Sequence, residues 1–108
     1  MWDLLKRRDE RRWQRREELR RKIRQQLREA IHELAPGEKV FLFGSITRPY
    51  TFHERSDIDI AFLEEPKHSR YGLQAKLEDI LRQPVDLIVL SECRFREKLE
   101  REGQVWTS

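Results

Sequence analysis

Residues 3–34 contain neither glycine nor proline, and Pro36-Gly37 follows them almost at once. Because glycine and proline are the strongest helix breakers, this stretch predicts one long helix that ends near residue 34. Its second half repeats apolar residues at intervals of three and four, which makes a stripe able to lie on a sheet. The stripe consists of Leu19, Ile23, Leu27, Ala30, Ile31 and Leu34.

The first half of the same helix is basic and has few apolar residues. Residues 1–34 carry 12 Lys and Arg against 7 Asp and Glu, so the net charge of +3 for the whole chain has its basic excess at the N-terminus. Such a segment cannot contribute to a hydrophobic core, and we expect it to project from the body of the protein. Arginines recur every four residues in the predicted helix, at Arg8, Arg12, Arg16, Arg20, Arg24 and Arg28. This arginine ladder permits a solvated surface, partner docking through Trp and Arg groups, or nucleic-acid binding. The interleaved acids make nucleic acid the least favoured of the three.

Strand and helix patterns alternate after residue 36. Strands are predicted at about 38–43, 57–63 and 85–90, and helices at 70–82 and 92–101. This alternation indicates an α/β sandwich. The helix over 70–82 should face the sheet with its apolar stripe, and the C-terminal pair Val105-Trp106 should tuck against the body. The apolar residues of the predicted helix 70–82 are Leu73, Leu77, Ile80 and Leu81.

Length and composition limit the remaining choices. A chain of 108 residues, 40% charged and 37% hydrophobic, fits a single domain over 1–108 with a modest core. We expect residues 1–34 to form the basic helix and residues 36–106 the packed core of this domain. Cys93 is the single cysteine, so no intrachain disulfide is possible. No apolar stretch approaches the roughly 18 residues of a membrane span, and the N-terminus lacks a secretion signal, so a cytoplasmic location is expected.

Two aspartates at alternate positions, Asp57 and Asp59, carry the strongest chemical signal in the chain. In an extended strand both carboxylates point to one face, while Ile58 and Ile60 point to the other. Asp is depleted from strands and like charges repel, so a divalent cation between the two is the simplest compensation. The alternative is that both sit on a solvated strand end.

Asp86 is a third candidate carboxylate. The run from Pro84 to Leu90 is apolar except at this position, which predicts a central strand covered on both faces. A buried carboxylate has to be hydrogen-bonded, paired or bound to a metal. Three acids on neighbouring strands, without a His or Cys cluster, suit Mg²⁺ better than zinc. The plainer alternative is that Asp86 caps a turn.

The dipeptide Gly44-Ser45 ends the first predicted strand abruptly. Glycine lets the backbone approach a ligand closely, and Ser45 is expected to cap a short helix whose free N–H groups attract a phosphate. Neither the P-loop pattern nor the dinucleotide fingerprint is present. Arg48, three residues further on, could hold a terminal phosphate in a planar fork, although a solvated loop arginine is an equal reading.

These residues together resemble a known family. Gly44-Ser45, Arg48, the run from Ser56 to Ile60 and Asp86 look like the minimal nucleotidyltransferases of the DNA polymerase β superfamily. The shared pattern is Gly-Ser, a short spacer, Asp-x-Asp, and a later strand with a third acid. The resemblance covers about residues 36–106. Two departures concern the loop: its spacer from Ser45 to Asp57 is one residue longer than the usual ten, and Pro49 stands where glycine commonly follows the arginine.

The resemblance implies a mixed sheet flanked by helices, in an α+β core of polymerase β type. It also implies two Mg²⁺ ions, a nucleoside triphosphate, and transfer of a nucleoside monophosphate to a hydroxyl with release of pyrophosphate. Asp57, Asp59 and Asp86 would hold the metal, while Gly44, Ser45 and Arg48 would bind the nucleotide. Small stand-alone members resemble antitoxins encoded beside a HEPN-domain ribonuclease toxin, which they silence by attaching AMP to a toxin tyrosine.

On this resemblance ATP is the expected substrate. A HEPN-type toxin is the expected partner, contacted through the N-terminal helix and the active-site face, and self-association is left open. Two alternatives stand beside this reading. One is an antitoxin or adaptor with a degenerate site that neutralises its partner by binding alone; the other is nucleotide addition to RNA. The scattered histidines and the two tyrosines favour no further chemistry; they are His32, His53, His68, Tyr50 and Tyr71.

Overall fold

The computed structural model of the chain describes residues 2–67, 69–92, 94, 97–98, 101 and 103–107, with the backbone alone for 2–5 and 104–107. The predicted helix over 92–101 lies largely outside these residues. The elements in chain order are α1 (Trp2–Leu34), β1 (Lys39–Phe43), η1 (Gly44–Thr47), β2 (Ile58–Phe62), α2 (Arg70–Leu81), β3 (Val85–Val89), η2 (Leu90–Glu92) and β4 (Gln104–Thr107). Both η elements are short 3-10 helices.

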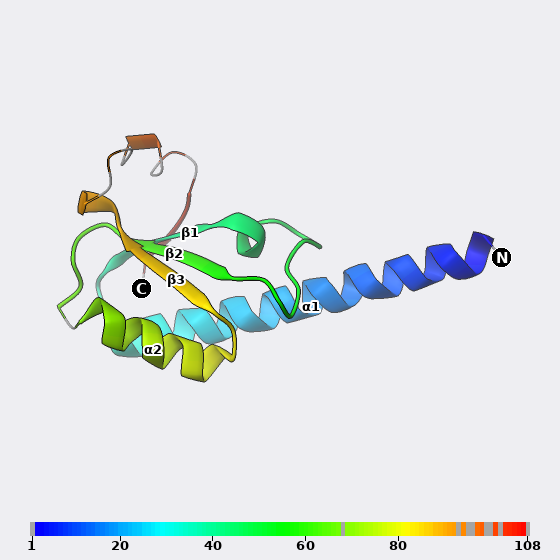
Figure 1. Cartoon of the computed structure of the whole chain (residues 1–108), viewed down its shortest axis with the longest axis horizontal. Helices are drawn as coiled ribbons and strands as arrows, with labels where there is room; N and C mark the ends of the chain where they lie inside the picture. Colours follow the sequence, from blue (N-terminus) through cyan, green and yellow to red (C-terminus); the bar gives the residue numbers. More distant parts are fainter. Residues whose placement is uncertain are drawn as a thin grey trace.

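The strands form one mixed sheet in the order β3-β2-β1-β4. β1 is antiparallel to both β2 and β4, whereas β2 and β3 run parallel. Figure 1 shows α1 and α2 side by side under one face of this sheet. The predicted fold class, a small mixed sheet with helices and a long N-terminal helix, is therefore confirmed. The strand β4 was not predicted: residues 105 and 106, expected only to tuck against the body, pair with β1.

The main core lies between the sheet and the second half of α1. Ile23, Leu27, Ala30 and Ile31 are buried there, and Leu19 and Leu34 pack at its margin, as the stripe predicted. Alternate residues of the strands supply the other side of this core, because side chains on a strand point to opposite faces in turn. They include Val40 and Leu42 of β1, Ile58, Ile60 and Phe62 of β2, and Val85 and Leu87 of β3.

The buried side of α2 differs from the predicted stripe at one residue. Leu73, Leu77 and Leu81 are buried, but Ile80 is 46% exposed, so its predicted burial was wrong. The helix is rotated so that Gln74 and Glu78 are half-buried. With about 100° between successive residues, this rotation places Ile80 at the outer margin of the packed side.

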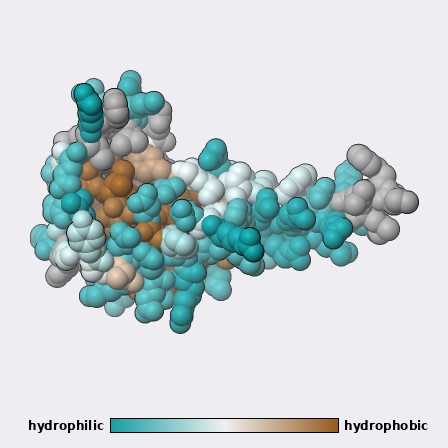
Figure 2. Space-filling view, in the orientation of Figure 1, coloured by the Kyte–Doolittle hydropathy of each residue, from teal (hydrophilic) through white to brown (hydrophobic). Residues whose placement is uncertain are grey.

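The opposite face of the sheet carries a smaller apolar cluster. Phe41, Ala61 and Leu90 are buried there, and three further hydrophobic residues pack against them partly exposed: Phe43, Leu63 and Ile88. Figure 2 shows hydrophobic surface gathered on the body of the molecule, whereas the outer part of α1 is hydrophilic. Because both faces bury apolar side chains, the strands read as nearly continuous hydrophobic runs in the sequence.

The first half of α1 projects from the body, as predicted (Figure 1). Residues 6–15 are all exposed, and the molecule measures 55 × 29 × 19 Å along its principal axes. Trp13 is 48% exposed on this segment. None of the helices in the described part of the chain combines the length and the apolar content needed to cross a bilayer.

Candidate nucleotide-binding site

The pairing of β2 with β3 places two of the predicted acids next to each other. Asp59 of β2 pairs with Asp86 of β3 in the parallel ladder and with Phe43 of β1 in the antiparallel ladder. Residues in register on neighbouring strands point to the same face of a sheet. The neighbours of Asp59, Ile58 and Ile60, face the helices. The two carboxylates therefore lie on the face of the sheet opposite α1 and α2.

Asp57 completes the group. It comes directly before β2 and is exposed, while Asp59 is half-buried. The pKa of Asp59 is raised above its usual value, first by burial and then by the negative charges of Asp86 and Asp57. Like charges act on a pKa in this way only when they are close. Asp86, in register on β3, and Asp57, two residues before Asp59, thus both lie near Asp59 at the start of β2 and β3.

The environment of Asp86 is not the predicted one. β3 is the edge strand of the sheet, bonded to β2 alone among the described strands, and Asp86 is exposed. The prediction of a central strand covered on both faces was therefore wrong. Its apolar run has two separate causes: Val85 and Leu87 pack toward the helices, whereas Ile88 joins the smaller cluster on the other face.

Gly44 stands beside this group for a steric reason. Its φ is +73°, in the left-handed region, and a Cβ atom at this position would lie 2.6 Å from Oδ2 of Asp59. Any other residue would be strained in its backbone and would push the carboxylate aside. Glycine at this point is what lets the end of β1 and the Asp59 side chain occupy adjacent space.

Ser45 does not cap a helix as expected. It lies inside η1, and Phe43 takes the position before that turn, without a side-chain cap. The carbonyl oxygen of Ser45 accepts hydrogen bonds from the N–H of Arg48 at 3.1 Å and from Oγ1 of Thr51 at 3.0 Å. A further bond of 2.6 Å, from Oγ1 of Thr47 to the Gly44 carbonyl, closes the turn. The backbone of η1 is therefore well fixed.

The structure does not bring the Arg48 guanidinium to the carboxylates through any contact. Arg48 follows η1, is exposed, and its side chain has no hydrogen bond or ion pair with the described residues. Its backbone alone is tied to the turn. An exposed arginine on a short loop is available to an anion.

Glu17 and Arg20 are functional candidates that sequence reasoning missed. Glu17 is buried, and its carboxylate accepts two hydrogen bonds from Nη1 of Arg20, at 2.9 and 3.2 Å. The Nε–H of Arg20 donates to the carbonyl oxygen of Ile46 in η1 at 2.9 Å. Oε1 of Glu17 also accepts the N–H of Tyr50 at 3.2 Å. α1 thus holds both η1 and the loop that follows it.

This network explains how the unusual spacer is accommodated. Tyr50, directly after Pro49, has a φ of +65°, a conformation that is strained for a residue with a side chain. The bond from its N–H to the buried Glu17 fixes this strained position. A signal for the network does exist in the sequence: Glu17 and Arg20 are an opposite-charge i,i+3 pair on the continuation of the apolar stripe of α1.

The three carboxylates are oxygen donors of the kind that bind a hard cation, but they do not form a preformed metal site. No three His, Cys, Asp or Glu side chains within the described ranges lie close enough together to ligate one ion as they stand. Asp57 and Asp86 are exposed, so their side chains can rotate at little cost. A cation would relieve the repulsion that raises the pKa of Asp59. Oxygen donors of this kind suit Mg²⁺.

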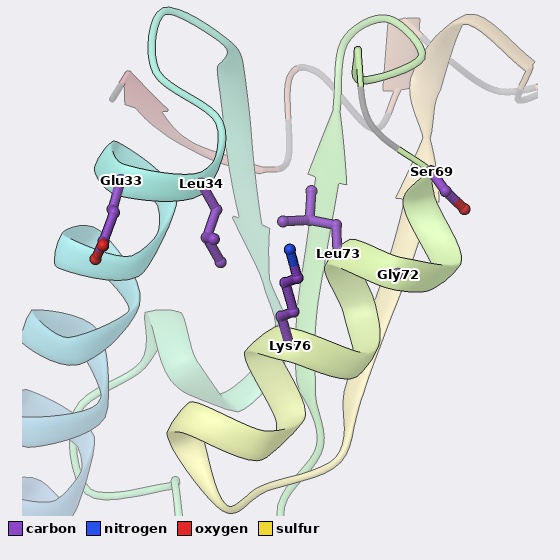
Figure 3. A pocket seen from close by; sticks show the side chains of 6 residues that line it. All are labelled: Glu33, Leu34, Ser69, Gly72, Leu73 and Lys76. Carbon is purple, nitrogen blue, oxygen red and sulfur yellow. The ribbon is translucent and has the colours of Figure 1, made fainter.

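A separate hollow of about 320 Å³ lies in the helix layer between α1 and α2. In Figure 3, Lys76 and Leu73 extend from α2 toward Leu34 of α1, whereas Ser69 points away. This hollow is on the helix side of the sheet, while the carboxylates are on the other side. It does not contribute to the candidate site.

Comparison with known proteins identifies the family. Residues 22–108 match the family of polymerase beta nucleotidyltransferases, and the chain belongs to this family. The match begins in the middle of α1, so it takes in the docked half of that helix and leaves out the projecting half. No curated protein matches the chain.

Several solved structures are similar to the chain in three dimensions. A toxin–antitoxin crystallised with AMP-PNP has 25% identity and a TM-score of 0.59, over 78% of this chain and 73% of that one. A mutant toxin–antitoxin MntA-HpeT has 25% identity and a TM-score of 0.55, over 74% and 69%; its two Asp-to-Glu changes are two residues apart. The toxin–antitoxin MntA-HepT, at 22% identity, shares the fold with a TM-score of 0.56 over 82% and 73%. The chain is thus similar to proteins of toxin–antitoxin complexes.

Proposed function

We propose that the protein is a magnesium-dependent nucleotidyltransferase that moves AMP from ATP to a hydroxyl group of a partner protein, a HEPN-type ribonuclease toxin that it silences. The observation that carries this proposal is the in-register pair Asp59 and Asp86, with Asp57 beside them and Gly44 against Asp59. Membership of the nucleotidyltransferase family supports the type of reaction. The relative crystallised with AMP-PNP supports an adenine nucleotide as substrate.

Each residue has a role in this proposal. Asp57, Asp59 and Asp86 would hold two Mg²⁺ ions, which supply charge stabilisation for an in-line displacement at phosphorus. The acceptor hydroxyl oxygen bonds to the α-phosphorus, the bond from that phosphorus to the bridging oxygen breaks, and pyrophosphate leaves. Asp86, exposed at the sheet edge, takes the hydroxyl proton. The mutant relative, changed at two aspartates with the spacing of Asp57 and Asp59, supports the importance of such a pair.

The nucleotide is oriented by the turn next to these acids. Gly44 and Ser45 place backbone close to the triphosphate, and Arg48 balances the charge of the departing pyrophosphate. The exposure of Arg48 supports this role, since the guanidinium is not held elsewhere in the described structure. Residues 36–106 would form the catalytic core of a single domain, and residues 1–34 the helix that meets the partner together with the active-site face.

Transfer of label tests the proposal. The protein is incubated with ATP labelled at the α-phosphate, Mg²⁺ and the protein encoded next to it. Label should appear on that neighbour, should need Mg²⁺, and should be lost in Asp57→Asn and Asp59→Asn variants that still bind it. Undiminished labelling by the double variant would overturn the assignment.

A second candidate is an antitoxin that neutralises its partner by binding alone. The absence of a preformed three-carboxylate cage in the described residues favours it, as does the longer spacer containing Pro49. Tight association with the neighbour and no transferred label, at any Mg²⁺ concentration, would identify this function. Nucleotide addition to RNA would instead lengthen an RNA in the same assay.

A further inference from the structure

A groove lies between the projecting half of α1 and the loop that leads into β2. It has a volume of about 460 Å³, and α1 lines it with Arg12, Arg15, Arg16 and Leu19, while the loop contributes His53, Glu54 and Arg55. A second hollow, of about 270 Å³, continues it along α1 and is lined by arginines only: Arg7, Arg8, Arg11 and Arg15. Arg15 belongs to both. We name these two hollows together the arginine groove.

The fold separates the charges that are mixed in the sequence. Among the residues that line the arginine groove, Glu54 is the single acid beside seven arginines. Glu17 is turned inward to Arg20, and the other acids of this half of α1 do not line the groove. The sequence argument against a polyanion site, that acids interrupt the arginine ladder, therefore does not apply to this surface.

The guanidinium groups of the groove are available to a ligand. Arg12, Arg15 and Arg55 are exposed and Arg16 is half-exposed, and none of their side chains pairs with another described residue. Unpaired arginines at this density repel one another, so a bound anion lowers their electrostatic energy. Arg also presents a planar fork of donors that matches a phosphate.

We infer that the arginine groove binds the phosphate backbone of a single nucleic-acid strand. Residues four apart on a helix are displaced by about 6 Å along its axis and turned by about 40° around it, so Arg8, Arg12 and Arg16 form a regularly spaced array that curves slowly around the helix. Such an array suits a polymer with regularly repeated charges better than it suits one anion or an irregular acidic protein surface. Trp13 is 48% exposed and lines neither hollow, but it is three residues from Arg16 and therefore lies next to it on the helix surface, where it offers a face on which a base stacks.

Fluorescence anisotropy with a labelled single-stranded RNA of mixed sequence tests the inference, without any nucleoside triphosphate. If four guanidiniums each neutralise one phosphate, the logarithm of the binding constant should fall against the logarithm of salt concentration with a slope of about −3. Replacing Arg12, Arg16 and Arg55 together by Gln should reduce that slope by about 2 and weaken binding roughly ten-fold or more. Trp13→Ala should weaken binding about five-fold and leave the slope unchanged.

The matched control removes three positive charges outside the groove, as Lys22→Gln, Lys67→Gln and Lys76→Gln, all exposed positions. It should bind RNA nearly as the unaltered protein does. Three results would overturn the inference: an equal loss in the control, equal affinity for polyglutamate at the same salt concentration, or no RNA binding at low salt. Because no transfer is measured, failure here is distinct from failure of the proposed reaction.

Discussion

Asp59 has to be ionised for its proposed function, but its negative charge makes the fold less stable. It is half-buried between Asp57 and Asp86, and both burial and these charges raise its pKa. A group whose pKa is raised on folding adds stability that is complete below its unfolded-state pKa and is lost as pH rises through the folded-state value. At neutral pH the ionised Asp59 therefore destabilises the fold, unless a cation is bound.

The first prediction concerns Asp59→Asn in a buffer without divalent cations. Solvent screens a half-buried site, so the gain in free energy of unfolding near pH 7 should be about 0.5 kcal/mol, a rise in Tm of about 2–4 °C. The difference should vanish near the usual pKa of Asp, about 3.9. Adding Mg²⁺ should raise the Tm of the unaltered protein but not that of the variant. Asp79→Asn, at an exposed position of α2, is the control, and a lower Tm for Asp59→Asn at pH 7 would contradict this view.

The second prediction separates backbone strain from contact with the carboxylate. Gly44 and Gly37 both have positive φ, +73° and +80°, but a Cβ at Gly37 would meet nothing within 4 Å. Gly44→Ala and Gly37→Ala should each lose about 1–2 kcal/mol in unfolding by urea. Only Gly44→Ala should also weaken Mg²⁺ binding, because only its Cβ displaces Asp59. Equal metal affinity in both variants would mean that Gly44 serves the turn alone.

At the scale of elements, α1 holds η1 and the loop that follows it in place. Its buried Glu17 and Arg20 reach the Ile46 carbonyl and the Tyr50 N–H, on either side of Arg48. The projecting half of the same helix is continuous with this network.

The third prediction tests whether Glu17 holds this loop in place. Glu17→Gln removes the charge that pairs with Arg20 in a largely buried setting, so it should cost about 1–3 kcal/mol in unfolding free energy. It should also speed hydrogen exchange at the Tyr50 amide more than at amides of the sheet. Glu18→Gln, exposed on the same helix, should change both quantities little. A Tyr50 amide that exchanges at the same rate in both variants would refute the role of Glu17.

Features that depend on residues close together in the sequence were predictable. Features that depend on the order of the strands in the sheet were not. The stripe from Leu19 to Leu34 follows from local periodicity, and the proximity of Asp57 to Asp59 follows from their spacing in the sequence. The exposed edge position of Asp86 depends on strand order, which an apolar run does not reveal. The same holds for β4, whose few residues become a strand only by pairing with β1.

The candidate site was predictable to a similar degree. Sequence reasoning singled out Gly44 for its backbone, but not the approach of Asp59 that excludes a side chain there. It assigned a cap to Ser45 that η1 does not use. It missed Glu17 because a buried charge is visible only once its partners, Arg20 and the Tyr50 N–H, are placed in space.

At the scale of the whole molecule, the protein consists of a packed body and a long exposed helical extension. Residues 6–15 bury none of their side chains, so the fourth prediction is that removal of residues 2–12 lowers the unfolding free energy by less than about 1 kcal/mol. The same truncation should weaken association with the partner protein if α1 docks it. A large loss of stability on truncation would contradict the division into body and extension.

The most direct test of whether metal and nucleotide bind together is isothermal titration calorimetry of AMP-PNP into the protein. It is done first with Mg²⁺ and then with EDTA in place of Mg²⁺. Binding should require Mg²⁺ and should fall at least ten-fold in Asp57→Asn, Asp59→Asn and Asp86→Asn variants whose Tm is not lowered. Equal affinity in EDTA, or in all three variants, would show that these carboxylates do not hold a metal-bound nucleotide.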